Sequence, residues 1–274
     1  MKNERFFEPG ARRFFAVLLG AALLSACASI PEPVTPEQRS LLAPSGALKV
    51  GLYPGTPTAI LVSEGSSAPR GVGYELGQAF AQQLGVAFEP VVLPKNADVL
   101  EAIKTGKVDV AFTNATASRA RNMDFTWPYL EIEMGYLVPA NSSLKSIDEI
   151  DRQGIRVAVT TNSTSDEVLT RSLKNANVVR ANTLKIGLAM LAEGQAEAYA
   201  TNKATLFEMA DDLPGAQVLK GYWGVERHAI AIPKGREAGL PVVQKFAEDA
   251  RASGLVVGAA KRAGLRGVLE AGSQ

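Results

Sequence analysis

Residues 105–129 read TGKVDVAFTNATASRARNMDFTWPY, and the apolar run at 108–112 in this stretch is predicted to form a short β-strand. The chain before it continues an alternation of short strands and amphipathic helices. Strands are expected at 48–52 and 86–93, and helices at 75–84 and 97–104. The alternation is typical of an α/β fold.

A second series of strands and helices follows the first. Strands are expected at 156–159, 178–179 and 196–200, and helices at 164–173, 184–192, 242–250 and 255–263. Two further segments, 134–139 and 229–233, are each a strand stopped by a proline. If the later one returns the chain to the first series, lobe 1 comprises residues 47–135 and 230–274, and lobe 2 comprises residues 136–229.

The first 26 residues have the features of a secretion signal. Four basic residues precede an apolar run of 11 residues, 14–24, which is too short to span a bilayer as a conventional helix. Removing residues 1–26 takes away 4 of the 29 basic and 2 of the 28 acidic residues. The mature chain is therefore expected to carry a net charge of −1 in place of +1.

The only cysteine, Cys27, directly follows Leu24-Ser25-Ala26 at the end of the apolar run. This arrangement resembles the lipobox of bacterial lipoproteins, in which the thiol is lipidated and the signal is cut just before it. An incidental buried cysteine is the alternative, but no partner thiol exists. Residues 27–46 are then expected to form an extended, proline-containing tether between the membrane and the folded domain.

The composition limits the possible functions. The 274 residues are 46% hydrophobic and 21% charged, which suffices for one large or two modest domains. A net charge near zero excludes the basic surface that nucleic-acid binding requires. Because His228 is the only histidine, no multi-histidine metal site can form, and neither a metal nor a cofactor is predicted.

Several short motifs follow one another along the chain: GYEL at 73–76, TGKVDVA at 105–111, Arg119 before MDFTWPY at 123–129, VAV at 157–159, and Ser163-Thr164. Their order and spacing over residues 48–265 resemble the polar amino-acid-binding class of periplasmic solute-binding proteins, family 3. The resemblance implies a type II periplasmic-binding-protein fold, with two α/β lobes, two crossing hinge strands and a ligand in the cleft.

Arg119 is the first candidate for ligand binding. A guanidinium matches a carboxylate bidentately and stays charged in a poorly hydrated cleft. In the resembling family, an arginine five residues before the Asp-Phe pair binds the ligand carboxylate, and Arg119 stands five residues before Asp124. The alternative is a solvated arginine in a loop that also contains Arg121.

Residues 164–167, TSDE, have the sequence of a capping box at a helix start. Capping alone explains these residues, although helix starts also attract anions. In the resembling proteins this helix start meets the ligand carboxylate, so Ser163 and Thr164 are expected to contact the ligand from lobe 2.

Three positions depart from the family pattern. Asn114 stands where a serine or threonine is common and still donates and accepts hydrogen bonds. Asn202 replaces the aspartate that pairs with a ligand ammonium, and Thr56 stands at about the place of a stacking aromatic residue. The resemblance therefore implies retained carboxylate recognition and doubtful amine recognition, with Thr116 completing the candidate set.

Other candidates have structural explanations. Gly71, Gly73 and Gly77 do not have the spacing of a dinucleotide fingerprint and indicate a turn. His228 is expected on the second hinge strand as a structural residue. Either Glu131 or Glu133 is a candidate to face the cleft, where it could bind a cationic group or act as a general acid.

The leading hypothesis is a lipid-anchored, monomeric periplasmic receptor that delivers a carboxylate-bearing solute, an amino acid or a derivative, to ABC permease subunits. An enzyme similar to cyclohexadienyl dehydratase, using the same cleft, is the alternative. A sensor or wall-processing protein is a third possibility, and it would need a separate partner chain.

Overall fold

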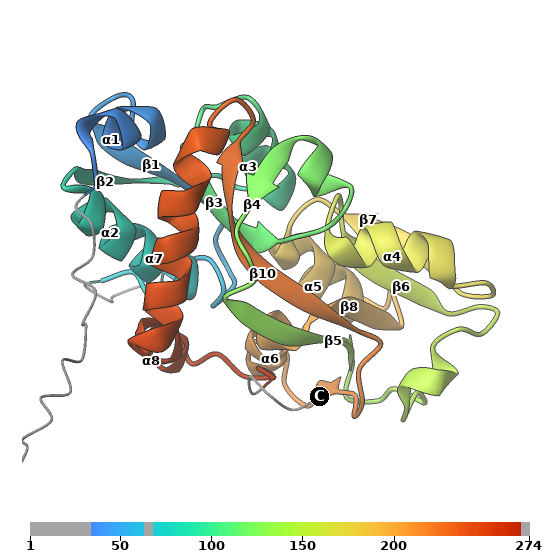
Figure 1. Cartoon of the computed structure of the whole chain (residues 1–274). Coiled ribbons are helices and arrows are strands. Elements are labelled where there is room, and N and C mark those ends of the chain that lie inside the picture. The colour runs from blue at the N-terminus through green and yellow to red at the C-terminus, as the bar shows by residue number, and fades with distance from the viewer. Residues whose placement is uncertain (1–33, 63–67, 270–274) are drawn as a thin grey trace, which may run out of the picture. The chain divides into compact units, whose positions relative to one another are not determined.

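One mixed sheet of ten strands organises the computed structural model, which describes residues 34–62 and 68–269 (Figure 1). Eight strands lie in the order β2-β1-β3-β10-β5-β8-β6-β7, while β4 pairs with β10 and β9 pairs with β5. The strands are β1 Ala47–Leu52, β2 Ala87–Val92, β3 Val110–Asn114, β4 Met123–Phe125, β5 Leu130–Val138, β6 Arg156–Thr160, β7 Asn177–Ala181, β8 Ala198–Asn202, β9 Gln217–Val218 and β10 Gly224–Pro233.

Eight α-helices and three short 3-10 helices connect the described strands. The α-helices are α1 Pro36–Leu42, α2 Val72–Leu84, α3 Asn96–Lys104, α4 Thr164–Ser172, α5 Leu184–Ala192, α6 Lys203–Asp211, α7 Leu240–Ala252 and α8 Leu255–Arg262. The 3-10 helices are η1 Arg119–Arg121, η2 Ile147–Glu149 and η3 Glu237–Gly239. Most predicted elements are present within a few residues of their expected bounds, whereas α1, α6, β4 and β9 were not predicted.

Two strands join the two halves of the sheet. In register, β5 and β10 pair antiparallel from Leu130 opposite His228 to Met134 opposite Gly224. Further along, β10 pairs with β3 and β4, and β5 pairs with β8 and β9. We call β1 to β4 with α1, α2, α3, α7 and α8 lobe 1, and β6 to β9 with α4, α5 and α6 lobe 2.

This topology confirms the predicted α/β fold with two lobes and two crossing strands. Figure 1 shows α7 and α2 beside the strands of lobe 1, and α4 and α5 beside β6 and β8. Because β5 and β10 each run through both lobes, the residue boundaries 47–135, 136–229 and 230–274 stay a prediction.

Each lobe has its own apolar core. In lobe 1 the predicted face of α2 places Leu76, Phe80 and Leu84 at 1% exposure or less, and the Phe80 ring packs on Phe246 with centroids 4.7 Å apart. In lobe 2, Tyr199 is fully buried among apolar residues of α5 and α6. The buried apolar residues of the described chain form four clusters, two mainly in lobe 1 and two in lobe 2.

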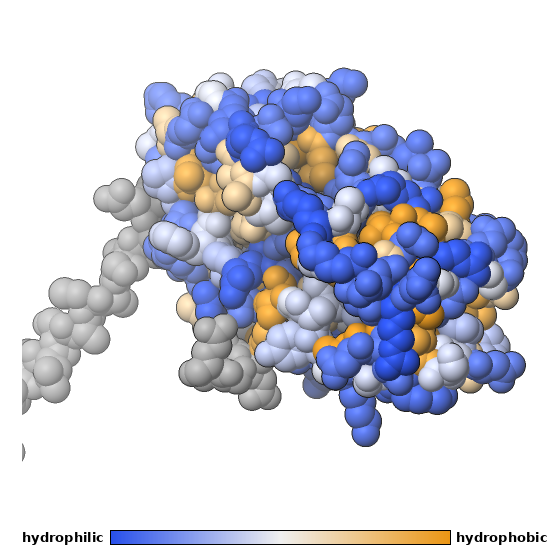
Figure 2. Space-filling view, turned by 90° about the vertical axis from the view of Figure 1, so that its right-hand side faces the viewer, coloured by the Kyte–Doolittle hydropathy of each residue, from blue (hydrophilic) through white to orange (hydrophobic). Residues whose placement is uncertain are grey.

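The face of the molecule in Figure 2 has an ordinary mixture of hydrophilic and hydrophobic residues. On the face in Figure 2, hydrophilic residues surround small, separate hydrophobic areas. Such scattered areas are normal for a folded domain. Among the described residues, no helix combines the length and the apolar composition that crossing a membrane would need.

The predicted tether at 27–46 is wrong for its second half. Residues Pro36–Leu42 form α1, which starts with a capping box between Thr35 and Gln38 and has a proline in its first turn. Leu42 is fully buried in the lobe 1 core, so this segment belongs to the folded domain. Cys27 and the predicted signal at 1–26 lie outside the described residues.

Leu42→Ala should lower the free energy of unfolding by roughly 2–5 kcal/mol, because it removes a buried side chain and leaves a cavity. Leu41→Ala, on the same helix but only half-buried, is the matched control and should cost clearly less. Urea unfolding of both variants measures the difference. Equal, small effects would restore the tether interpretation.

Candidate functional site

A small cavity lies between the lobes where the parallel strands end. Tyr53 follows β1, Asn114 ends β3, Thr160 ends β6 and Asn202 ends β8, and all four line the cavity. In open α/β sheets, ligands bind at the carboxyl ends of strands. The fold therefore brings these polar side chains together at the carboxyl ends of the strands, where a binding crevice also forms.

The lobes are in direct contact around this cavity. Asn114 Nδ2 donates to Thr164 Oγ1 at 2.9 Å in the cavity wall, and beside the cavity the hydroxyls of Thr56 and Thr205 lie 2.8 Å apart. The enclosed space is about 30 Å³, far below the roughly 300–1,000 Å³ of typical ligand pockets. A solute can therefore enter only if the lobes separate and these contacts break.

Arg119 reaches the cavity from η1 in lobe 1. Its Nη1 donates to Thr113 Oγ1 at 2.7 Å and to the Asn114 carbonyl at 3.1 Å, and Nη2 lies 3.5 Å from the Asn162 carbonyl in lobe 2. Burial lowers the pKa of Arg119 from its ordinary value, while the charge of Glu226 opposes that effect. Among the described residues, Arg119 makes no ion pair.

The start of α4 faces Arg119 from lobe 2, but its cap differs from the prediction. Ser163, one residue earlier than expected, is the N-cap and accepts from the Asp166 amide at 3.1 Å. Glu167 does not close a capping box, because its carboxylate accepts from Ser118 at 2.6 Å and from Arg171 at 2.8 Å. Ser163 and Thr164 both line the cavity.

Asn202 lines the cavity with its carboxamide fully engaged. Its Oδ1 accepts from the Thr205 amide at 3.0 Å and so caps α6, and its Nδ2 donates to Glu226 Oε2 at 2.9 Å. The cap fixes the orientation of the carboxamide, since only the oxygen can accept. Residue 202 is thus a structural element of lobe 2 as well as part of the site.

Glu226 and His228 are site residues whose role the sequence did not predict. They alternate with exposed Arg227 on β10, so both point inward, and they are 7% and 5% exposed. His228 Nε2 lies 3.0 Å from Glu226 Oε2. Burial raises the pKa of Glu226, but the hydrogen bond and charge of His228, the charge of Arg119 and the Asn202 hydrogen bond together bring it below its ordinary value.

Two members of the predicted set do not line the cavity. Thr56 is buried in the contact with Thr58 and Thr205, and Thr116 contacts Ser118 and the Arg119 amide beside the cavity. The expected lack of an aromatic residue is wrong, because Tyr53 and Phe112 line the cavity. Trp127 is 74% exposed and Tyr129 is buried against Phe112, so neither of them forms the site.

Glu131 and Glu133 also lie away from the cavity. Glu131 pairs with Arg227 at 3.0 Å on the surface, and Glu133 pairs with Lys203. Neither residue lines the cavity or the wider pocket of about 530 Å³ that opens outside it. The carboxylate that does reach the cavity is Glu226.

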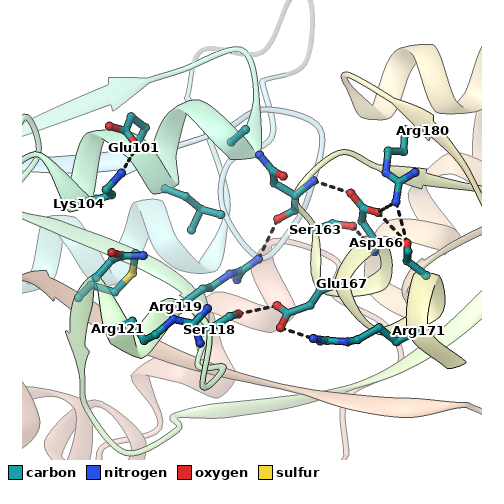
Figure 3. Close-up of a pocket in the computed structure, with 16 residues that line it drawn as sticks. Glu101, Lys104, Ser118, Arg119, Arg121, Ser163, Asp166, Glu167, Arg171 and Arg180 are labelled. Carbon is teal, nitrogen blue, oxygen red and sulfur yellow. Dashed lines mark hydrogen bonds and ion pairs between the residues drawn. The ribbon is translucent and has the colours of Figure 1, made fainter.

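A wider pocket of about 530 Å³ opens outside the cavity and shares Arg119 with it. Figure 3 shows Ser118, Glu167 and Arg171 in one line of contacts across this outer pocket, and Asp166 paired with Arg180 at 2.8 Å. Arg119 therefore separates the cavity from the mouth of the cleft. No cluster of three potential metal ligands occurs in the described part of the chain.

A two-lobed α/β protein with charged and polar groups from both lobes around an interlobe cavity is a ligand-binding protein of the periplasmic type. The chain belongs to the bacterial extracellular solute-binding proteins, family 3, whose family model matches residues 48–261.

Curated relatives agree with the family. The Bacillus subtilis ABC transporter glutamine-binding protein GlnH is 28% identical over 50% of this chain and 50% of its own length. A probable histidine-binding protein of Neisseria gonorrhoeae is 26% identical over 56% of this chain and 59% of its own length. The matched regions thus span about half to three fifths of these relatives.

Solved structures agree on the fold. An amino acid ABC transporter substrate-binding protein of Streptococcus pneumoniae, bound to L-arginine, has a TM-score of 0.74 at 20% identity and covers 85% of this chain and 99% of its own. An ancestral arginine-binding protein bound to glutamine has a TM-score of 0.70 at 26% identity and covers 79% and 97%.

The lowered pKa of Glu226 predicts a pH-dependent contribution to stability. An ionised carboxylate that the folded state favours stabilises it above the ordinary pKa of 4.5, and the contribution is lost as the pH falls toward the lowered value. Glu226→Gln should therefore be destabilised relative to wild type at neutral pH, and the difference should shrink below pH 4.5. Urea unfolding at several pH values measures it; a difference that grows in acid would contradict the assignment.

Proposed function

We propose that the protein is the extracytoplasmic binding component of an ABC-type importer and captures a small carboxylate-bearing solute between its lobes. The solute enters the open cleft, both lobes contact it, and bending of β5 and β10 closes the cleft. The closed form then docks on permease subunits. Periplasmic location follows from the family together with the predicted signal.

This proposal depends mainly on the surroundings of the Arg119 guanidinium. The guanidinium faces the cavity, contacts only neutral oxygens among the described residues, and has donors on both Nη atoms directed toward the two lobes. Arg119 is half-buried, and a charge that is partly removed from water is stabilised by a compensating partner. A ligand carboxylate supplies that partner, and Asn114, Ser163 and Thr164 add hydrogen-bond donors around it.

The names of similar proteins support an amino acid or a derivative as the solute. Glutamine and histidine appear in the names of curated relatives, and arginine and glutamine are bound in solved structures of the same fold. An importer as the partner is supported by the same names, since GlnH and the Streptococcus pneumoniae protein are described as ABC transporter components.

A receptor is favoured over an enzyme by the carboxylates near the cleft. Elimination chemistry needs a protonated general acid. Glu131 and Glu133 are paired outside the cavity, and the pKa of Glu226 is lowered, so this carboxylate is ionised at neutral pH. Absence of prephenate or arogenate turnover by the purified protein would agree with the receptor, and turnover would establish the enzyme.

Arg119→Ala should weaken ligand binding by roughly 2–5 kcal/mol, at least about 30-fold in Kd, because it leaves a buried carboxylate without its charge partner. Arg121→Ala is the matched control, since Arg121 is exposed and lines only the outer pocket. Calorimetry with the best ligand from a library of amino acids and small carboxylates measures both. An unchanged Kd in Arg119→Ala would remove Arg119 from the site.

Membrane attachment through a lipid on Cys27 is part of the proposal, and the sequence around Cys27 supports it. Cys27→Ser should move the protein from the membrane fraction to the soluble extracytoplasmic fraction of expressing bacteria. Cell fractionation with immunoblotting measures the distribution. Equal membrane association of the variant and the wild type would contradict the anchor.

A further inference from the structure

Among the described residues, Glu226 is the one carboxylate that lines the interlobe cavity, and it has no part in the proposed carboxylate site. Its two hydrogen bonds, from Asn202 Nδ2 at 2.9 Å and from His228 Nε2 at 3.0 Å, both fall on Oε2. Oε1 accepts no hydrogen bond from the described residues, yet it is not sealed from solvent as His228 Nδ1 is. One oxygen of an ionised carboxylate is thus open to the cavity.

Asn202 offers a ligand ammonium no charged partner. Its only acceptor, Oδ1, is directed to the Thr205 amide at the start of α6, and its Nδ2 is a donor that is directed to Glu226. Nδ2 cannot accept, and Oδ1 is an uncharged acceptor, so Asn202 could give an ammonium only a neutral hydrogen bond. Among the described residues that line the cavity, Glu226 is the only acceptor with a negative charge.

The contact between Asn202 and Glu226 also explains why residue 202 is not an aspartate here. An aspartate would place a second carboxylate oxygen about where Nδ2 now lies, 2.9 Å from Glu226 Oε2. Two carboxylates so close cannot both ionise without a large penalty. Asparagine at 202 and glutamate at 226 are therefore complementary, and the negative charge sits on the hinge strand.

We infer that Glu226 is the residue that recognises a cationic amine on the ligand, so that the solute carries both a carboxylate and an amine. This inference rests on the proposed function, because it assigns the second half of the same site. Arg119 and Glu226 line one cavity with opposite charges, which matches a zwitterion better than a simple carboxylate. His228 Nε2 lies against Oε2 and not against Oε1, so Oε1 stays available.

The test compares each L-amino acid with its analogue that lacks the α-amino group, for example L-glutamine with glutaramic acid and L-arginine with 5-guanidinopentanoic acid. Calorimetry on the full-length mature protein gives the ratio of the two Kd values. The wild type should favour the amino acid by about 10- to 100-fold, the range expected for a charge-assisted hydrogen bond. In Glu226→Gln this ratio should fall close to one.

A charge swap makes the test specific. Asn202→Asp alone should bind poorly and unfold at lower temperature, because it puts two carboxylates in contact. The double variant Asn202→Asp/Glu226→Gln reverses the hydrogen bond, keeps a good helix cap at 202 and returns one negative charge to the cavity. It should regain much of the amine preference that Glu226→Gln loses. Glu131→Gln, a carboxylate outside the cavity, is the matched control and should keep the wild-type ratio.

The outcomes separate the inference from the proposed function. Equal affinity of the wild type for amino acids and their amine-free analogues would overturn the role of Glu226 and leave the carboxylate receptor standing. A Glu226→Gln variant that is folded at the assay temperature and keeps its amine preference would overturn the inference as well. Failure of the wild type to bind either class of compound would remove both.

Discussion

The antiparallel pairing of β5 with β10 is the interaction on which both lobes depend. Its ladder runs from Leu130 opposite His228 to Met134 opposite Gly224, and each strand then continues into pairings with a different lobe. A shift of this register by one residue would turn the inward side chains of β10 to the opposite face. Backbone hydrogen bonds along two strands thus determine the connection between the lobes and also the presence of Glu226 and His228 in the cavity.

The rest of the site follows from where the parallel strands end. Strands β1 and β3 in lobe 1 and β6 and β8 in lobe 2 all end at the cavity, and α4 and α6 start close to the ends of β6 and β8. Ser163 and Asn202 cap these two helices, so the residues that stabilise the helix starts are also residues that line the cavity. The capping side chains therefore also contribute to the wall of the cavity.

Local sequence patterns predicted much of the fold, since α2, β3 and α5 have clear apolar periodicity or β-type composition. The capping box at Thr35 and the Asn202 cap are local signals for α1 and α6 that apolar periodicity does not contain. Arg119 could be predicted because spacing within one loop identifies it. The proposed role of Glu226 could not be predicted. It depends on a contact with Asn202, 24 residues away, and on the pairing of β5 with β10, and no local sequence pattern indicates either of them.

The position of the Glu226 carboxylate on a strand that both lobes share determines where its charge can act on a solute. Arg119 belongs to lobe 1, whereas Glu226 lies on β10, one of the two strands that both lobes share. At physiological salt the Debye length is about 8 Å, so these charges act on a solute only once it is inside the cleft. In the proposed receptor, diffusion of a solute to the protein is therefore insensitive to these charges, and a dipolar solute takes its orientation inside the open cleft before the lobes close.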